Sequence, residues 1–282
     1  MNQTTQSQAT GRNGKTPETI MASYLTHELR APVTAIKLGL EIFEEQVATR
    51  LQADERQMLT LAIKNTGRLQ GLVNDIMDYT KVLAGKMKLD FQTCDARELL
   101  SEVVDSFQAW AISKGIRLVK EDSNEPLPRI KAEPKRVIQV LTNLLSNALK
   151  FTPARGTVTV GVKAGKYEHA GTLVFRVKDS GAGIPAEHLE SIFETFSQSV
   201  TNGKQSDGTG LGLTLARSMV QLHGGKIWAE SWKGLGATFR FTIPISPEDL
   251  PEPIEVYANP VEYHGLFVDV YRKLNAFVAM LF

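Results

Sequence analysis

The chain has 282 residues, enough for about two domains, and 42% of them are hydrophobic while 22% are charged. The formal net charge of +1 argues against a protein that binds nucleic acid through its phosphates, because such proteins typically carry a clear basic excess. The single cysteine, Cys94, excludes an internal disulfide framework and is typical of a reducing compartment. We therefore expect a cytoplasmic protein in which Cys94 is a small buried side chain.

The sequence contains no candidate for a membrane-spanning helix. No stretch in the sequence approaches the roughly 18 consecutive apolar residues that a membrane-spanning helix needs. The chain is therefore expected to be soluble, unless a membrane-bound sensory half lies outside it. Residues 1–15 are polar and predict a disordered leader.

Residues 16–86 have the pattern of a helical hairpin. Thr16-Pro17 is a typical helix start, because a capping residue precedes a proline in the first turn. Apolar residues then recur three or four positions apart as far as Val47, and a second stripe begins at Met58. Two long helices cannot bury such wide apolar faces against each other alone. We therefore predict a homodimer in which two hairpins form a four-helix bundle.

Residues 87–246 combine short strand-like segments with helical ones. This mixture predicts an α+β sandwich, with antiparallel strands and with helices on one face of the sheet. We expect helices over 96–114, 134–151 and 211–223, and strands over 87–93, 116–121, 157–162, 173–177, 226–231 and 237–243.

Residues 247–282 differ in character from both of these parts. Four prolines in an acidic stretch predict a stiff linker. The apolar segment from Val261 to Phe282 predicts a helix of unknown role. It is either the start of another domain or an amphipathic segment that docks on this protein, on a partner or on a membrane.

His27 is the first candidate for chemistry. It lies about 200° around the predicted helix from Leu25 and so faces away from the apolar stripe, although an exposed histidine on a helix is often an ordinary surface residue. Glu28 could hold one ring nitrogen and leave the other as a nucleophile. Pro32 removes the hydrogen bond to the carbonyl group of Glu28 and predicts a bend just after the histidine.

The predicted helix over 134–151 carries Asn143, Asn147 and Lys150 on one face. Amide oxygens are ligands that suit Mg²⁺, and a lysine ammonium group suits phosphate oxygens. The same residues are also compatible with a plain polar helix face.

Two glycine-rich segments suggest nucleotide binding. In Asp179-Ser-Gly181-Ala-Gly183, a carboxylate at the end of a strand can accept an adenine amino group, and the glycines let the backbone approach a flat base. A pattern this short also marks plain turns. The segment from Asp207 to Leu213 leads into a predicted helix, whose N-terminal N–H groups can bind phosphate. It lacks the preceding strand and the acidic residue of a dinucleotide site.

Taken in order, these segments resemble the motifs of the sensor histidine kinases of two-component systems. The resemblance extends over about residues 16–245 and is carried by the whole series of motifs rather than by any one. The matching segments are His27-Glu-Leu-Arg-Ala-Pro32 (phosphoacceptor motif), Asn143–Thr152 (N box), Asp179–Gly183 (G1 box), Phe193-Glu-Thr-Phe196 (F box), Asp207–Leu213 (G2 box) and Gly234–Thr238 (last glycine box).

The resemblance implies a dimerisation and phosphoacceptor hairpin over 16–86 and a Bergerat-type ATP-binding domain over 87–246. It implies that His27 attacks the γ-phosphate of ATP with Glu28 as base, and that an aspartate in the receiver domain of a response regulator takes the phosphoryl group. It also makes Asn147 the Mg²⁺ ligand. The remaining implied nucleotide-binding residues are Asn143, Lys150, Asp179, Gly181, Gly183, Phe193, Phe196, Gly208, Thr209, Gly210, Leu211, Gly212 and Thr238.

One residue departs from the pattern of the family. Many members carry Thr or Asn four residues after the histidine, where the side chain positions a water that dephosphorylates the regulator. Ala31 occupies that place here and has no such group, so we expect weak or absent phosphatase activity by this route.

Two other classes of function remain as alternatives. Clamp-like ATPases and the serine kinases that phosphorylate anti-anti-sigma factors use the same ATP-binding fold, but they lack a hairpin with this histidine motif. A binding or scaffold protein that retains ATP and has lost kinase activity would carry damaged motifs, whereas the motif residues here look intact.

Overall fold

The computed structural model describes residues 17–47, 49–121, 125–195 and 210–245, with side chains from Glu28 onward. The described residues divide into two compact units, one that ends at Lys86 and one that begins at Met87. The expected leader and the expected linker and helix of 247–282 lie outside the described residues.

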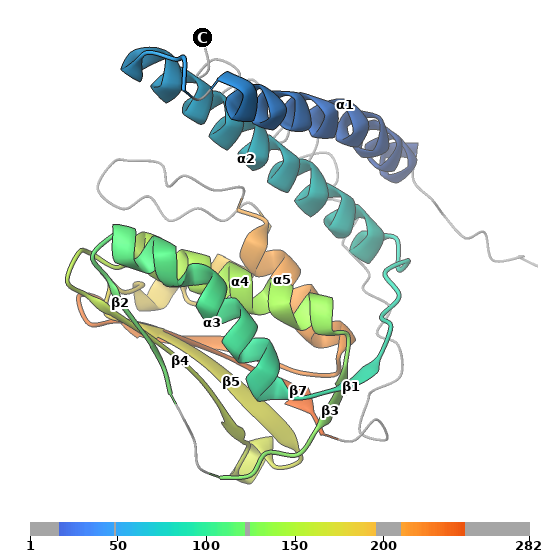
Figure 1. Cartoon of the computed structure of the whole chain (residues 1–282). Helices are drawn as coiled ribbons and strands as arrows, with labels where there is room; N and C mark the ends of the chain where they lie inside the picture. Colours follow the sequence, from blue (N-terminus) through green and yellow to red (C-terminus); the bar gives the residue numbers. More distant parts are fainter. Residues whose placement is uncertain (1–16, 48, 122–124, 196–209, 246–282) are drawn as a thin grey trace, which may run out of the picture. The chain divides into compact units, whose positions relative to one another are not determined.

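The first unit is a helical hairpin, as predicted (Figure 1). Helix α1 covers Pro17–Val47 and continues through Pro32, and helix α2 covers Ala53–Leu83. The carboxylate of Glu55 accepts a hydrogen bond from the backbone N–H of Gln52 at 2.9 Å. This bond satisfies a donor that would otherwise be free at the start of α2.

The hairpin leaves one apolar stripe of α1 uncovered. Val33 is buried. In contrast, Leu29, Ile36 and Phe43, each seven residues from the next, keep 44%, 55% and 49% of their surface exposed. The apolar face of α1 is therefore wider than α2 alone can cover.

The second unit is an α+β sandwich with three helices on one face of a five-stranded sheet (Figure 1). The strand order in that sheet is β2-β4-β5-β7-β6, and β1 pairs with β3 in a separate two-stranded sheet. The helices are α3 (Ala96–Ser113), α4 (Pro134–Phe151) and α5 (Gly212–Leu222). The strands are β1 (Gln92–Cys94), β2 (Arg117–Lys120), β3 (Ile130–Ala132), β4 (Thr157–Ala164), β5 (Thr172–Asp179), β6 (Ile227–Trp232) and β7 (Gly236–Pro244), and short 3₁₀ turns cover Tyr167–His169 (η1), Ala186–His188 (η2) and Ser191–Phe193 (η3).

Two of the predicted strand features were wrong. β2 and β4 pair in parallel, not antiparallel, because the connection between them contains a full helix, which is long enough to return the chain to the same end of the sheet. The predicted strand over 87–93 was too long: only Gln92–Cys94 pairs, in register with the three residues of β3.

Buried and more exposed side chains alternate along the central strands and point to opposite faces of the sheet. On the helix side, Phe175 of β5 stacks on Phe241 of β7 with ring centroids 4.6 Å apart. Leu144 and Leu145 of α4 and Leu215 of α5 are fully buried above them. The residues between the buried ones point to the other face, which carries no α-helix among the described residues and is called the helix-free face below.

Candidate functional site

Asp179 ends β5 on the helix side of the sheet and is only 5% exposed. Its Oδ1 accepts hydrogen bonds from the backbone N–H groups of Gly181 at 2.8 Å and Ala237 at 3.2 Å. Burial raises the pKa of Asp179 above its usual value, while these two bonds act in the opposite direction. Its Oδ2 accepts no hydrogen bond from any residue that the structure describes, so one oxygen is fixed and the other is available.

The loop after Asp179 passes other backbone segments so closely that only glycine fits. A Cβ atom on Gly181 would lie 2.6 Å from the carbonyl oxygen of Phe151, at the end of α4. A Cβ atom on Gly183, where φ is +72°, would lie 2.2 Å from the carbonyl oxygen of Trp232. The loop is thereby held between the end of α4 and the turn that joins β6 to β7.

The turn between β6 and β7 is fixed against the same loop. The backbone N–H of Gly234 donates to the carbonyl oxygen of Ala182 at 2.7 Å. A Cβ atom on Gly236 would lie 2.0 Å from the carbonyl oxygen of Asp179. These contacts bring the G1 segment and the last glycine segment together.

The register of β7 bears on the predicted role of Thr238. Thr238 lies opposite the exposed Lys178 of β5, so its side chain points to the helix-free face, away from Asp179. The residue of β7 that contacts Asp179 is Ala237, through its backbone N–H. A backbone donor leaves no signature in a sequence, which is why the motif directed attention to the threonine.

Helix α4 and the start of α5 are joined by Asn143. Its Nδ2 donates to the carbonyl oxygen of Gly212 at 2.9 Å. Asn147, one turn further along, is half-buried, and its amide makes no hydrogen bond with any described residue. The ammonium group of Lys150 lies 5.4 Å from the ring centroid of Phe151.

The G2 segment is described only from Gly210 onward. Gly210 has a φ of +69°, a conformation that favours glycine and turns the chain into α5. Leu211 is buried in the core, and a Cβ atom on Gly212 would lie 3.6 Å from the side chain of Asn143, which is an ordinary contact distance. The predicted site residues Gly208, Thr209 and Phe196 lie outside the described part of the chain.

The F-box residue Phe193 packs in the core. Its ring meets that of Phe239 edge-on, with centroids 6.3 Å apart, and it is 6% exposed. This contact packs η3 against β7, so Phe193 stabilises the fold whether or not it also touches a nucleotide.

His27 lies in helix α1 by its backbone, as predicted. Its side chain is outside the described residues, so the predicted exposure of the ring stays a prediction. The neighbouring Glu28 is exposed.

The role of His223, just after α5, was not predicted from the sequence. Its Nε2 accepts a hydrogen bond from the backbone N–H of Glu133 at 3.1 Å, and its Nδ1 contacts the carbonyl oxygen of Met219 at 2.7 Å. These partners require a neutral ring with the proton on Nδ1. Burial accordingly lowers the pKa of His223. The ring joins the start of α4 to the end of α5 and so helps to hold the two helices that carry the site.

The donors and acceptors of this region fit an adenine nucleotide with a divalent ion. The buried carboxylate offers one free oxygen to an amino group, and the glycine-lined loop leaves its backbone accessible. The amide oxygen of Asn147 is a hard ligand without a competing partner among the described residues, which suits Mg²⁺ completed by phosphate and water oxygens.

Comparison with known proteins identifies both units. The His Kinase A (phospho-acceptor) domain matches residues 18–85, and the histidine kinase-, DNA gyrase B- and HSP90-like ATPase domain matches residues 132–247. The chain belongs to the sensor histidine kinases. This histidine kinase therefore contains an ATP-binding domain of that ATPase family, preceded by the phosphoacceptor domain.

Several curated relatives share both domains with this kinase. The non-motile and phage-resistance protein of Caulobacter vibrioides is 36% identical over 80% of the chain, and the circadian input-output histidine kinase CikA of Synechococcus elongatus is 36% identical over 82%. The chain spans 27% and 30% of the length of these two relatives. It spans 57% of the adaptive-response sensory kinase SasA of Synechocystis, to which it is 32% identical.

Solved structures of other histidine kinases share its fold. Full-length ShkA in complex with AMPPNP is 30% identical, with a TM-score of 0.67 over 80% of this chain and 46% of that one. Histidine kinase ThkA in complex with the response regulator protein TrrA is 29% identical, with a TM-score of 0.53 over 81% of this chain and 62% of that one. Among the described helices of this kinase, none has the length and apolarity to cross a membrane.

Proposed function

We propose that this chain uses ATP to phosphorylate its own His27 and then passes the phosphoryl group to an aspartate of a response regulator. The observation that carries this proposal is the buried Asp179, with one oxygen held by two backbone donors and the other free, beside a loop where only glycine fits. The AMPPNP complex of ShkA and the regulator complex of ThkA support the choice of nucleotide and of partner.

In the proposed nucleotide site, the free oxygen of Asp179 accepts the adenine amino group. Asn147 would hold Mg²⁺, which supplies charge neutralisation at the phosphate oxygens. Asn143 positions the start of α5, where free N–H groups of the helix can bind phosphate. The proposed nucleotide-binding residues are Asn143, Asn147, Lys150, Asp179, Gly181, Gly183, Phe193, Phe196, Gly208, Thr209, Gly210, Leu211 and Gly212. Thr238 is left out because its side chain points away from Asp179, and the backbone of Ala237 positions Asp179.

In the proposed transfer, a ring nitrogen of His27 forms a bond to the γ-phosphorus of ATP. The bond between that phosphorus and the bridging oxygen breaks, and ADP leaves with the electron pair. Glu28 acts as the base that takes the proton from the ring. An N–P bond of this kind donates its phosphoryl group readily, which suits onward transfer to a carboxylate.

The proposed assembly is a homodimer through residues 16–86, with residues 87–246 as the ATP-binding domain. The uncovered stripe of Leu29, Ile36 and Phe43 supports it, because seven-residue spacing gives a continuous apolar seam along a helix. Ala31 supports weak phosphatase activity in that assembly, because its side chain cannot position a water. The single cysteine supports a cytoplasmic location.

Incubation with γ-labelled ATP and Mg²⁺ tests the proposal. Wild type and His188→Ala, which changes an exposed histidine of η2, should incorporate label that is labile in acid and stable in alkali. His27→Ala should incorporate none. Acid-stable label, or equal labelling of His27→Ala, would refute the proposal.

A further inference from the structure

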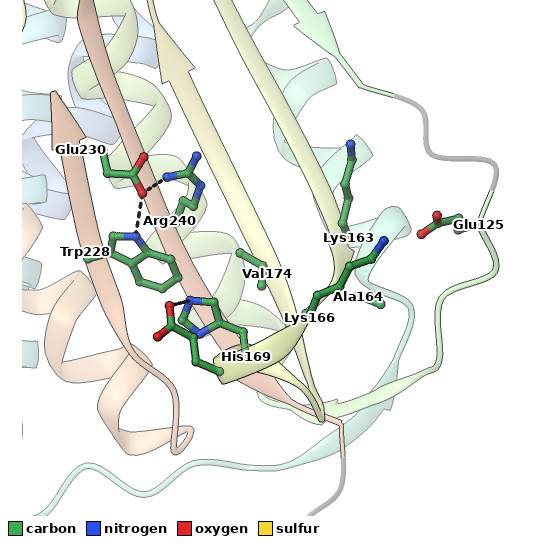
Figure 2. Close-up of a pocket in the computed structure, with 11 residues that line it drawn as sticks. Glu125, Lys163, Ala164, Lys166, His169, Val174, Trp228, Glu230 and Arg240 are labelled. Atoms are coloured by element: carbon green, nitrogen blue, oxygen red, sulfur yellow. Dashed lines mark hydrogen bonds and ion pairs between the residues drawn. The ribbon is translucent and has the colours of Figure 1, made fainter. Parts of the chain in front are cut away.

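A cavity of about 510 Å³ lies on the helix-free face of the five-stranded sheet. Its walls come from β4, β5, β6, β7 and η1 (Figure 2). Val174 of β5 lines this cavity, whereas Asp179 lies five residues along the same strand, about 16 Å away at 3.3 Å per residue, and points to the other face. The cavity is therefore separate from the nucleotide site.

One wall of the cavity is an aromatic pair. The imidazole of His169 stacks on the indole of Trp228, with ring centroids 4.7 Å apart and planes inclined by 21°. Trp228 Nε1 donates to Glu230 at 3.3 Å, and Glu230 forms an ion pair with Arg240. Both rings are thus held in place and offer a flat, rigid surface (Figure 2).

The opposite wall carries Lys163 and Lys166 (Figure 2). Both side chains are exposed, and neither forms an ion pair within the described ranges of the chain. Of the carboxylates around the cavity, Glu230 is paired with Arg240, and Glu168 lies 3.5 Å from His169. A third carboxylate, that of Glu125, also lines the cavity. Among the described residues, Lys163 and Lys166 are therefore the cations that line this cavity without an ion-pair partner, whereas Arg240 is paired with Glu230.

The chain itself leaves the sheet beside this cavity. At the end of β7, Pro244 lies opposite Thr172, and the N–H of Ile245 donates to the carbonyl oxygen of Gly171 at 2.9 Å, two residues from His169. The sequence that follows, residues 247–256, reads Pro-Glu-Asp-Leu-Pro-Glu-Pro-Ile-Glu-Val. It contains three prolines, four carboxylates and no cation.

We propose that residues 247–256 bind in this cavity, with prolines against the Trp228–His169 pair and carboxylates against Lys163 and Lys166. Proline-rich segments dock on aromatic surfaces because their extended conformation is already formed and costs little entropy. Ten residues extend over about 33 Å, so the segment reaches the cavity without strain. The tether gives it a high effective concentration there.

Fluorine NMR of the full-length chain labelled with 5-fluorotryptophan tests this contact. The chain has three tryptophans, so the signal of Trp228 is assigned by Trp228→Phe, and those of Trp110 and Trp232 serve as internal references. We expect the Trp228 signal to shift in the variant Glu248→Gln/Asp249→Asn/Glu252→Gln/Glu255→Gln and in Lys163→Ala/Lys166→Ala. Lys178→Ala, an exposed lysine of β5 that does not line the cavity, should leave it unchanged.

Two further measurements complete the test. High salt should shift the wild-type signal toward that of the charge variants, because screening weakens exposed ion pairs, and Pro251→Ala/Pro253→Ala should shift it as well. A Trp228 signal that is the same in wild type and in all these variants would overturn the proposal. A signal that changes on dilution would also overturn it, because the segment would then occupy the cavity of another molecule.

Discussion

The backbone N–H of Ala237 donates to Oδ1 of Asp179 at 3.2 Å, which ties the last strand of the sheet to the carboxylate that ends β5. Together with the bond from Gly181, this contact means that Oδ1 is occupied by hydrogen bonds from within the protein. The other oxygen, Oδ2, is the one that a nucleotide can use.

Asp179→Asn separates these two roles. The amide oxygen of asparagine can still accept both backbone bonds, so the midpoint of urea unfolding should change little. The amide NH₂ replaces Oδ2 and presents a donor to the donor group of adenine. We expect the affinity for AMPPNP, measured by calorimetry, to fall by at least about tenfold, or ~1.4 kcal/mol. Asp105→Asn, an exposed carboxylate on α3, is the control. Unchanged affinity in Asp179→Asn would exclude adenine recognition by Asp179.

Gly234, in the turn between β6 and β7, and Gly236, the first residue of β7, share a left-handed backbone conformation but differ in their surroundings. Gly234 and Gly236 have φ values of +84° and +87°, but a Cβ atom on Gly234 meets nothing within 4 Å, whereas one on Gly236 lies 2.0 Å from the Asp179 carbonyl oxygen. Gly234→Ala should cost about 1–2 kcal/mol through backbone strain alone. Gly236→Ala should cost a further 1–3 kcal/mol, roughly, through overpacking. Equal free energies of unfolding in urea would show that the close approach does not matter.

His223 predicts a loss of stability in mild acid. Its Nε2 accepts a bond in the folded protein, and burial lowers its pKa below the usual 6.5. Below that value the unfolded chain binds a proton that the native ring does not, so stability falls as pH falls from about 6.5 toward the folded-state pKa. Above about pH 6.5 the ring is neutral in both the folded and the unfolded chain, so the stabilisation by His223 no longer depends on pH.

The pH dependence is tested with His223→Gln. This variant should be less stable than wild type by about 1–3 kcal/mol at neutral pH, because a buried bond is lost. It should lose less additional stability than wild type between about pH 7.5 and 5.5, since no imidazole titrates. His188→Gln, at an exposed site, should follow wild type throughout. Parallel stability curves for His223→Gln and wild type would contradict the assigned neutral ring.

The exposed seam of α1 predicts how the chain assembles. Ile36→Glu places a charge in the seam and should convert a dimer to a monomer in sedimentation equilibrium. Leu38→Glu alters a side chain that is equally exposed, 55% in both cases, but lies two residues, or about 200°, around the helix. It should leave the dimer intact. Dissociation by both variants or by neither would place the interface elsewhere.

Much of this architecture could be predicted from the apolar spacing and the turn residues of the sequence, and particular elements show where such prediction fails. Helix α4 begins and ends at the predicted residues, because Pro134 marks its first turn and the apolar spacing continues to Phe151. β3 escaped prediction because three residues are too few to show alternation. The parallel pairing of β2 with β4 depends on a crossover, which local sequence does not encode.

The candidate site shows the same division. Asp179, Gly181 and Gly183 were predicted by residue type, since a carboxylate and a missing side chain are both visible in a sequence. The contribution of Ala237 is a backbone N–H, and that of His223 is a hydrogen bond with Glu133, 90 residues away in the sequence. Neither has a sequence signature, because each depends on distant segments meeting.

The most direct test of the central claim is to locate the phosphate after incubation with ATP and Mg²⁺. Tryptic cleavage gives the peptide of residues 16–30, which contains one histidine and five hydroxyl side chains, those of Thr16, Thr19, Ser23, Tyr24 and Thr26. Fragmentation by electron transfer at neutral pH keeps the labile N–P bond intact. We expect the added phosphate mass to fall on His27. Phosphate on one of the hydroxyl residues, or an unmodified peptide in a preparation that hydrolyses ATP, would contradict it.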